Sequence, residues 1–590
     1  MGFLSPINVS SHGKGVYHFY FSIRQIYPIF VVQSNQKKHY KKYIGNMRHY
    51  LSILQESMRE RWEKPALSDY RGETFTFAQM ATRIAKLHAT FKAIGLEPGD
   101  KVALAGKNCA RWAMGFMATA TYRGVAVPIL PDFAPNTIAG LTDHSESAVL
   151  FTERRIWEQM ELKDMPNLKA AIDLDNYSII YAKEEALVDT VAQIEQNMPS
   201  IIPAEKKIEA TDYTFSNIND LAIINYTSGT TSSPKGVMLT ALNISSNIDF
   251  ALNNIPVTDT DKIMSMLPLA HMYGMAFEFI YPLCGGGHVF FLGKTPTPTV
   301  LMQALSDIKP YLLITVPLVM EKIFKNKVMP TLNKPLMRVL TSIPVLNTII
   351  YKKVYTQLMG VFGGNLRSLV LGGAAISFPV EKVMRKIKLP YTVGYGMTEC
   401  APLIGYSPWE TFRMGSCGRA VTGVEVRIDS SDPANVVGEI QVKGDNVMQG
   451  YFKNPEATAA TFTEDGFLRT GDLGIIDKDG NIFIKGRSKC MILTANGQNI
   501  YPEEIESKLN SMPHVGESLV VDRKGGLVAL VALTADDQNA DKEEMAAIME
   551  QNRVELNRSL PAYGKIAKVE IIEGGFEHTP KQSIKRFLYN

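Results

Sequence analysis

The chain has 590 residues, of which 45% are hydrophobic and 21% charged, and this is the composition of an ordinary globular protein long enough for several domains. Its net charge of +3 is too small to indicate a nucleic-acid partner, and no basic run alternates with aromatic residues as RNA-binding sheets require. The five cysteines form no C-x-x-C pair and no histidine stands at metal-ligand spacing, which favours a reducing compartment and argues against a structural zinc site. They are Cys109, Cys284, Cys400, Cys417 and Cys490.

Residues 1–46 form an extension that does not match the pattern of the rest of the chain. Its aromatic-rich stretch Val16–Val32 is too short and, with Arg24, too polar to span a bilayer. Two explanations remain open. Either the basic cluster Lys37–Lys42 makes a peripheral contact with an anionic membrane at its inner surface, or translation starts at Met47 and the extension is not native. We favour the second explanation, and we expect a cytoplasmic protein.

Beyond this extension, short apolar strands alternate with helical stretches. Thr76 and Gln79 form a candidate capping box at the start of a helix that Gly95 closes. Strands are predicted at Lys101–Ala105 and Val125–Leu130, and near residues 221–226, 262–266, 288–292, 311–316 and 367–371. The alternation predicts an α/β fold of layered sheets and helices whose sheet faces are largely covered.

After Gly418 short strands are separated by turn signals, which predicts a β-rich part. These strands are expected at Val424–Ile428, Gly438–Lys443 and Ile482–Lys485. The segment Asp477–Gly480 resembles the start of a calcium loop, but the twelfth position is Ser488 instead of glutamate, so we predict a hairpin turn.

The last hundred residues predict a small α+β domain. Its expected elements are a helix over Pro502–Met512, two strands joined at Lys524–Gly526, a helix over Asp541–Leu556 and a strand over Lys568–Ile572. Pro502 is well suited to the first position of its helix, with acidic residues in the first turn.

The segment Tyr226–Gly236 carries the clearest chemical signal in the chain. It combines small and hydroxyl-bearing residues with one lysine, Lys235, and lies between two apolar strands. A loop with so little side-chain bulk brings backbone N–H groups close to an anion, and the lysine adds a positive charge. The segment is no Walker A loop, because Gly236 follows the lysine and a strand, not a helix, comes next. It predicts a polyphosphate-binding loop.

This segment resembles the phosphate loop of the adenylate-forming superfamily, which includes acyl-CoA synthetases, luciferases and peptide-synthetase adenylation domains. Ser232 departs from the glycine that the family usually has. Five further stretches resemble family motifs in the same order, and together they cover about residues 47–590. The resemblance implies a large multi-subdomain part that binds ATP and the acyl group (47–485), a hinge (486–490) and a small mobile C-terminal domain (491–590).

The resemblance also implies roles for individual residues. Phosphate contacts fall to Ser228, Gly229, Thr230, Thr231 and Lys235, with Thr230 and Lys235 acting in catalysis, and Thr227 helps to hold a metal ion and the α-phosphate. His271, at the end of Leu267–His271, lies beside the reacting carboxylate, although a histidine after an apolar run is equally often an ordinary core residue. Adenine lies against Gly373, Ala374 and Ala375, and against the segment that contains Gly394, Tyr395, Gly396 and Thr398.

Within that segment Tyr395 offers a ring for stacking on adenine, and Glu399 is a hard oxygen ligand suited to Mg²⁺. Asp472 accepts hydrogen bonds from the ribose hydroxyls, and Arg487 belongs to the same nucleotide site. Lys489 matches the hinge position, and Gly497 lies in the loop that approaches coenzyme A.

The catalytic lysine that the family carries near its C-terminus is displaced in this chain. Aligned on Arg586, the lysine position is occupied by Ser583. Lys585 and Lys581 lie on either side, and we expect Lys585 to take the role, with Lys581 second. The alternative is that both are ordinary surface lysines.

The resemblance therefore implies an ATP- and Mg²⁺-dependent fatty acid–CoA ligase that forms an acyl-adenylate and then a thioester. The span that contains Pro317–Ile323 is more similar to long-chain fatty acyl-CoA synthetases than to acetate enzymes. Two alternatives stay open. One is an adenylating ligase for an aryl acid or for an acyl carrier protein, and the other is an acyl or nucleotide binder without turnover.

Overall fold

The structure is a computed structural model that describes residues 47–227, 234–293, 297–493, 499–523, 526–561, 564–578 and 584–589. Residues 1–48 and 49–590 form two separate units. The predictions for the extension, including the basic cluster Lys37–Lys42, lie outside the described residues. All helices and strands of the described residues belong to the unit 49–590.

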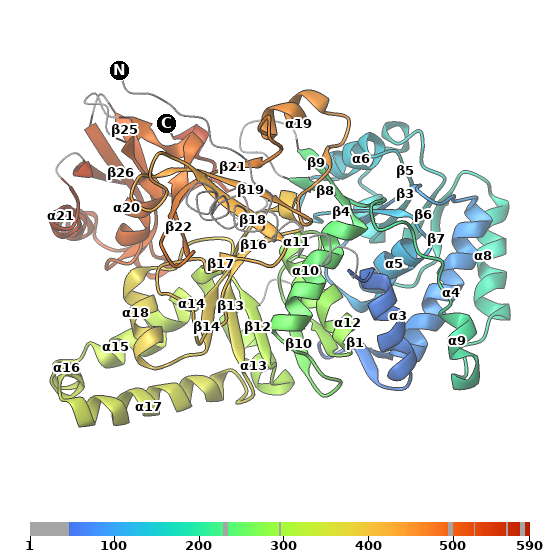
Figure 1. Cartoon of the computed structure of the whole chain (residues 1–590), viewed down its shortest axis with the longest axis horizontal. Coiled ribbons are helices and arrows are strands. Elements are labelled where there is room, and N and C mark those ends of the chain that lie inside the picture. The colour runs from blue at the N-terminus through green and yellow to red at the C-terminus, as the bar shows by residue number, and fades with distance from the viewer. Residues whose placement is uncertain are drawn as a thin grey trace, which may run out of the picture. The chain divides into compact units, whose positions relative to one another are not determined.

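Two large, mostly parallel sheets form the framework of this unit (Figure 1). The first has the spatial order β14 (Tyr391–Val393), β13 (Ser368–Leu371), β12 (Leu312–Thr315), β10 (Lys262–Ser265), β11 (His288–Phe291), β1 (Pro65–Asp69) and β2 (Thr74–Thr76). The second has the order β20 (Gly450–Tyr451), β9 (Lys235–Thr240), β8 (Leu221–Thr227), β4 (Val125–Ile129), β3 (Lys101–Ala105), β5 (Ser147–Thr152), β6 (Ala170–Asp173) and β7 (Ile179–Ala182). Strands such as β4 and β5 are buried along their whole length, as expected where helices cover both faces.

Helices connect these strands and cover the sheets. In chain order they are α3 (Tyr50–Glu60), α4 (Phe77–Ile94), α5 (Ala110–Thr121), α6 (Pro135–His144), α7 (Arg154–Trp157), α8 (Ala186–Asn197), α9 (Lys207–Ala210), α10 (Ala241–Asn254), α11 (Met272–Gly274), α12 (Tyr281–Gly285), α13 (Pro298–Ile308), α14 (Pro317–Ile323), α15 (Met329–Leu332), α16 (Pro335–Ser342), α17 (Pro344–Val361) and α18 (Phe378–Lys386). Two π-helical segments, η3 (Met275–Ile280) and η4 (Phe324–Val328), extend α11 and α14. Short 3₁₀ turns lie at η1 (Leu162–Asp164) and η2 (Ala204–Lys206).

The predicted capping box at the start of α4 is confirmed. The Thr76 side chain accepts a hydrogen bond from the Gln79 amide, and the Gln79 side chain accepts one from the Thr76 amide. Gly95 closes the helix with a left-handed backbone at φ 71°. These contacts satisfy amide groups that a helix end otherwise leaves without partners.

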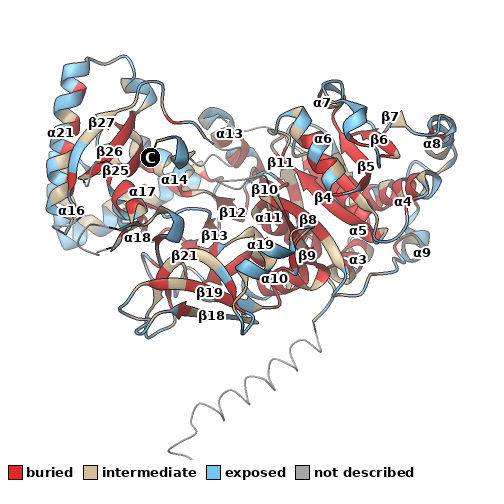
Figure 2. Cartoon of the chain, turned by 90° about the horizontal axis from the view of Figure 1, so that it is seen from above, coloured by how far each residue is buried: buried red, intermediate tan, exposed pale blue. Residues whose placement is uncertain are grey.

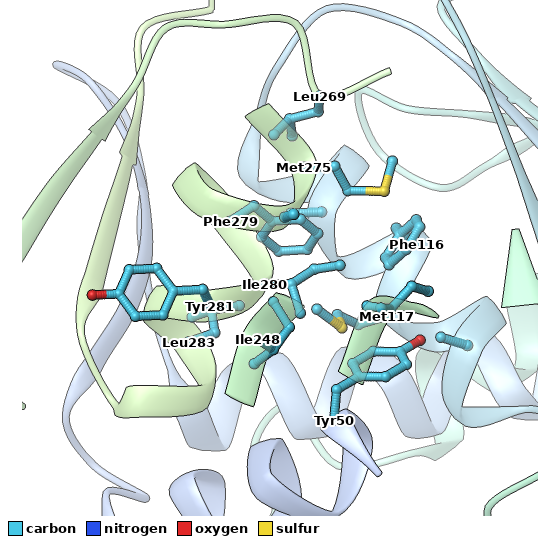
Figure 3. Close-up of a cluster of buried hydrophobic side chains, with 14 of the residues drawn as sticks. Tyr50, Phe116, Met117, Ile248, Leu269, Met275, Phe279, Ile280, Tyr281 and Leu283 are labelled. Atoms are coloured by element: carbon cyan, nitrogen blue, oxygen red, sulfur yellow. The ribbon is translucent and has the colours of Figure 1, made fainter. Parts of the chain in front are cut away.

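One continuous core joins the two sheets. It contains Leu104 of β3 and Ile263 of β10 together with side chains of the helices that pack on them. Figure 3 shows its centre, where Phe116 of α5 faces Phe279 of η3 with the ring centroids 5.7 Å apart. Tyr50 of α3 belongs to the same cluster (Figure 3).

The predicted β-rich part follows the two sheets. It comprises a three-stranded sheet, β15 (Tyr395–Gly396), β16 (Leu403–Tyr406) and β17 (Arg419–Ala420), and a four-stranded sheet, β18 (Val424–Asp429), β19 (Gly438–Gly444), β21 (Leu468–Ile476) and β22 (Ile482–Arg487), with η5 (Thr398–Cys400) and α19 (Pro455–Thr461). Asp477–Gly480 is the turn between β21 and β22, as predicted. Strand β21 was not predicted, because polar residues and Gly471 interrupt its apolar pattern.

The small C-terminal part has the predicted α+β character. Its elements are η6 (Ser488–Cys490), β23 (Ile492–Leu493), β24 (Asn499–Ile500), α20 (Pro502–Leu509), β25 (Val515–Arg523), β26 (Gly526–Leu533), η7 (Ala535–Asp537), α21 (Lys542–Arg558), β27 (Ile566–Ile571) and η9 (Arg586–Leu588). Helix α20 begins at Pro502 as predicted but ends three residues before Met512, at Leu509. Asp541 caps α21 through hydrogen bonds from the Glu543 and Glu544 amides. Among the helices within the described ranges, none is both long and apolar enough to cross a membrane.

Candidate active site

The carboxyl ends of neighbouring parallel strands open onto one large cavity. Thr315 of β12, Gly372 after β13 and Gly394 after β14 all line it, and its volume is ≈ 2610 Å³. In sheets of this kind, ligands bind at the carboxyl ends of the strands. The cavity is therefore where the predicted site residues are expected to meet.

Strands β8 and β9, which flank the predicted phosphate loop, meet this cavity with the residues at the two ends of the loop. They pair antiparallel, with Thr227 opposite Lys235, and both residues line the cavity. The other predicted phosphate-binding residues, Ser228, Gly229, Thr230 and Thr231, lie outside the described residues. The structure thus places the two ends of the loop, one hydroxyl and one ammonium group, at the cavity.

A tyrosine that the sequence did not single out links Lys235 to Glu399. The Lys235 ammonium lies 4.8 Å from the centroid of the Tyr451 ring. The Tyr451 hydroxyl donates a hydrogen bond of 2.9 Å to Oε1 of Glu399. Burial raises the pKa of Tyr451, so that its hydroxyl stays protonated and can donate. Tyr451 reaches this place because β20 pairs with β9, a long-range contact that no local pattern announces.

Asp472 is the most enclosed carboxylate of the predicted nucleotide site. The Tyr395 hydroxyl donates to Oδ2 of Asp472 at 2.8 Å, and the Arg487 guanidinium Nε lies 3.1 Å from Oδ1. Burial raises the pKa of Asp472, whereas the charge of Arg487 acts in the opposite direction. A carboxylate has about four acceptor positions, so these two partners leave capacity for further donors.

Small residues form the cavity wall where adenine is predicted to lie. A Cβ atom at Gly372 would come within 2.8 Å of the Tyr273 ring, and one at Gly396 within 2.2 Å of the Pro402 carbonyl oxygen. Gly373 adopts a φ of +86°, which favours glycine. The predicted residues Gly373, Ala374, Ala375, Gly394, Tyr395, Gly396 and Thr398 all line the cavity.

His271 lines the cavity just before α11, and a buried carboxyl group holds the segment that leads to it. Oε2 of Glu278 accepts hydrogen bonds from the amides of Met266 (3.0 Å) and Leu267 (2.9 Å) and from the Ser265 hydroxyl (3.2 Å). Glu278 is fully buried in the π-helical segment η3, a type of irregularity that is frequent at functional sites. Its acidic side chain amid apolar neighbours was the only sequence signal, and we missed it.

Part of the cavity wall is apolar. It is formed by Phe250, Ile255, Phe277, Tyr281, Leu312, Ile314 and Val370. Aliphatic and aromatic side chains of this kind favour an apolar ligand over a charged one. The lining of the cavity therefore combines polar side chains, among them Asp472 and Lys235, with apolar ones.

The residues predicted near the hinge also reach the cavity. Arg487 ends β22 and Lys489 lies in η6, and both line the cavity. Part of the predicted hinge 486–490 is strand, because Gly486 and Arg487 belong to β22. Gly497 lies outside the described residues.

Lys585 does not line the cavity in this arrangement. Lys585 donates a hydrogen bond to Oε2 of Glu577 at 3.2 Å, whereas its neighbours Ile584 and Arg586 line the cavity. Arg586 forms an ion pair with the buried Glu506 of α20. Lys581 lies outside the described residues.

Comparisons with known proteins agree with the predicted resemblance. The family model of the AMP-binding enzyme matches residues 54–452, and that of the AMP-binding enzyme C-terminal domain matches residues 490–589. The long-chain-fatty-acid–CoA ligase FadD15 of Mycobacterium bovis is 26% identical over 87% of this chain and 89% of its own length. The 4-coumarate–CoA ligase 1 of Petroselinum crispum is 27% identical over 80% of this chain and 82% of its own length.

Solved structures share the fold. The anthranilate CoA ligase AuaEII in complex with anthranoyl-AMP has a TM-score of 0.74 at 20% identity, covering 92% of this chain and 96% of that chain. ATP-bound MatB from Rhodopseudomonas palustris has a TM-score of 0.71 at 24% identity, covering 92% and 97%. The predicted α/β class with a small α+β C-terminal part is confirmed.

Replacement of Glu278 by glutamine tests whether the buried Glu278 carboxyl group, which accepts hydrogen bonds from residues 265–267, is neutral in the folded protein. Burial raises the pKa of Glu278 well above its ordinary value of about 4.3, against the opposing effect of its hydrogen bonds. Its stabilising effect is therefore complete below the ordinary pKa and is lost as the pH rises toward the folded-state pKa. The quantity to compare is the free energy of unfolding of the parent minus that of Glu278→Gln. As the pH rises through this interval, this difference should fall by up to about 1.4 kcal/mol per pH unit.

Denaturant unfolding of both proteins between pH 5 and pH 8 measures this difference. A difference between the two proteins that stays constant with pH would show that Glu278 ionises normally in the folded state.

Proposed function

Because this chain belongs to the AMP-binding enzyme family, we propose that it is an ATP-dependent ligase that joins fatty acids to coenzyme A. The observation that supports this most is the composition of one cavity, whose lining includes Lys235, the carboxylate of Asp472 and an apolar part of the wall. The first two groups are suited to binding a nucleoside triphosphate, and the third is suited to binding an acyl chain. The family membership supplies the reaction class, and the apolar wall supports the fatty substrate.

In the first half-reaction a carboxylate oxygen attacks the α-phosphorus of ATP. A bond forms between that oxygen and phosphorus, the bond between the α-phosphorus and the bridging oxygen breaks, and pyrophosphate leaves. Negative charge is redistributed over the phosphate oxygens, and a cation fixed beforehand lowers this barrier. Lys235 is suited to this task because the Tyr451 ring and strand β9 restrict its position.

Asp472 would fix the nucleotide by accepting hydrogen bonds from the ribose hydroxyls. An ionised carboxylate is the better acceptor, and Arg487 keeps the negative charge favourable in a buried position. Gly372 and Gly396 let the backbone of this wall pack closely against Tyr273 and Pro402, where a Cβ atom would clash. Thr398, Ala374 and the Tyr395 ring would complete this wall.

Magnesium ions fit the same site. Across the described ranges, no group of three or more His, Cys, Asp or Glu side chains could hold a metal ion alone. Mg²⁺ is usually bound by one or two carboxylates together with substrate phosphates, and Glu399 and Thr227 offer such oxygen atoms to the cavity. When bound there, the ion would neutralise charge on the phosphates.

In the second half-reaction the thiol of coenzyme A attacks the acyl carbonyl and AMP leaves. We propose that the small domain turns about Lys489 between the two half-reactions, so that one cavity serves both. The loop with Gly497 would then approach the pantetheine arm. Arg586 and Glu506 hold the C-terminal segment to α20, so that it would move with the small domain.

The substrate test compares fatty acids with an aryl acid. Pyrophosphate release should be strong with long-chain fatty acids and coenzyme A. It should be weak when 4-coumarate replaces the fatty acid, or when an acyl carrier protein replaces coenzyme A. Lys235→Ala should lower the rate by roughly two to four decades, because a fixed cation at developing charge contributes several kcal/mol. Lys478→Ala, an exposed lysine in a hairpin turn, is the matched control.

Preference for coumarate would replace the fatty-acid proposal by the aryl-acid one. Undiminished turnover in Lys235→Ala would remove Lys235 from the proposed site.

Tyr451→Phe separates the two contacts of Tyr451. The variant keeps the ring beside Lys235 but loses the hydrogen bond to Glu399. With Glu399 less well positioned, the Mg²⁺ concentration for half-maximal adenylation should rise several-fold. Tyr181→Phe, a tyrosine outside the cavity lining, should leave the Mg²⁺ titration unchanged. Superimposable titrations of Tyr451→Phe and the parent would count against a metal-positioning role.

The C-terminal lysines can be assigned by measuring the half-reactions separately. We propose Lys585 as the group that approaches the reacting phosphate once the small domain has turned, with Lys581 as the second choice. Lys585→Ala should then slow adenylation by roughly two to four decades while supplied acyl-adenylate still reacts with coenzyme A. If Lys581→Ala shows this pattern in place of Lys585→Ala, the assignment is wrong. Equal losses in both half-reactions would indicate a folding defect.

A further inference from the structure

The hairpin of helices α16 and α17 carries an exposed apolar surface. No residue from Thr331 to Gln357 is buried, although the segment is rich in aliphatic side chains. Nineteen large hydrophobic residues of the described chain are exposed, and six of them fall within residues 336–349. These six are Leu336, Val339, Ile343, Val345, Leu346 and Ile349. Figure 2 shows the exposure of α16, and Figure 1 shows both helices as the yellow-green hairpin.

Every charged side chain of the same hairpin is basic. No aspartate or glutamate occurs between Lys322 and Val380. The four basic residues of the hairpin are Lys334, Arg338, Lys352 and Lys353, and all four are exposed. None of them forms an ion pair with any described residue. The charge therefore has no counterpart within this part of the chain.

Apolar and basic side chains share one face of α17. Val345, Ile349 and Lys352 follow at intervals of four and three residues, which places them along one side of the helix. Lys353 stands next to Lys352 on the same exposed side. A helix that combines aliphatic residues with unpaired cations is suited to an interface between water and anionic lipid headgroups.

A second copy of the chain fits this surface less well. A twofold contact would place the same patch against itself and bring the four cations of each copy together. Like charges at an interface oppose association. An anionic lipid surface offers both an apolar layer for the six aliphatic side chains and negative charge for the four basic ones.

The inner end of the hairpin reaches the cavity. Leu358 and Val361, in the last turn of α17, line it together with Leu301 and Met302 of α13. The tip and the base of one helix therefore have different surroundings, solvent at Val345 and the cavity at Leu358.

We propose that the α16–α17 hairpin is a docking surface for an anionic membrane. Its six aliphatic side chains enter the headgroup region and its four cations contact lipid phosphates. The docking does not depend on which acid the cavity takes, and it uses residues separate from the basic cluster Lys37–Lys42.

Sedimentation of the full chain with lipid vesicles tests the docking. One set contains phosphatidylcholine and phosphatidylglycerol in equal amounts, and the other contains phosphatidylcholine alone. The chain should bind the anionic vesicles, and added salt should weaken that binding. Val345→Glu/Ile349→Glu and, separately, Lys352→Glu/Lys353→Glu should each bind at least about tenfold more weakly, because each lysine near such a surface contributes about 1 kcal/mol.

Matched controls come from helix α9 and the turn before it. Ile208 is 63% exposed, close to the 61% of Ile349, and Lys206 and Lys207 form a second lysine pair. Ile208→Glu and Lys206→Glu/Lys207→Glu should bind vesicles like the parent. Adenylation of detergent-dispersed fatty acid should be equal in all variants, because none of the substituted residues lines the cavity.

Three results would overturn the proposal. The first is parental vesicle binding by both hairpin variants, which would assign any binding to another region such as Lys37–Lys42. The second is equal binding to neutral and anionic vesicles. The third is absence of anionic-vesicle binding by the parent. If sedimentation equilibrium then shows a dimer that Val345→Glu/Ile349→Glu dissociates, the hairpin is a contact between copies.

Discussion

The buried carboxylate of Asp472 is the interaction on which the arrangement of the site depends. It is only 7% exposed, and it receives one hydrogen bond from Tyr395 and one charged contact from Arg487. A buried carboxylate without such partners would take up a proton, because burial alone penalises its charged form. These contacts tie three strands of the β-rich part, β15, β21 and β22, to one point of the cavity.

Arg487, one partner of Asp472, lies directly before the segment that connects to the small domain. Arg487 is the last residue of β22, and the short turn Ser488–Cys490 leads directly to the small domain. Any rotation about Lys489 would start two residues from the Asp472 pair. The large part could thus keep Asp472 in place while the small domain changes orientation, as the two proposed half-reactions in one cavity require.

Much of the fold could be predicted because its signals are local. Capping at Thr76 and Gln79, the αL residue Gly95 and the turn Asp477–Gly480 are set by residues close in sequence, and each was found where it was expected. The ends of the predicted phosphate loop, Thr227 and Lys235, lie at the cavity for the same reason, since apolar strands flank them.

The features that were missed depend on contacts between distant segments. Strand β21 has an interrupted apolar pattern and is held by β19 and β22. Tyr451 meets Lys235 and Glu399 only because β20 joins the edge of the second sheet. Glu278 anchors Met266 and Leu267 from the π-helical segment that follows them, and the burial of its carboxyl group cannot be read from spacing.

The proposed reaction passes through an acyl-adenylate, and the transfer of a labelled oxygen atom from the fatty acid to AMP would reveal this intermediate. A fatty acid labelled with the heavy oxygen isotope in both carboxylate positions is converted with ATP and coenzyme A, and the AMP is analysed by mass spectrometry. If a carboxylate oxygen attacks the α-phosphorus, that oxygen stays with the phosphate when the thiol displaces AMP, so each AMP should carry one labelled oxygen. Unlabelled AMP, or release of ADP with labelled inorganic phosphate, would exclude an acyl-adenylate intermediate.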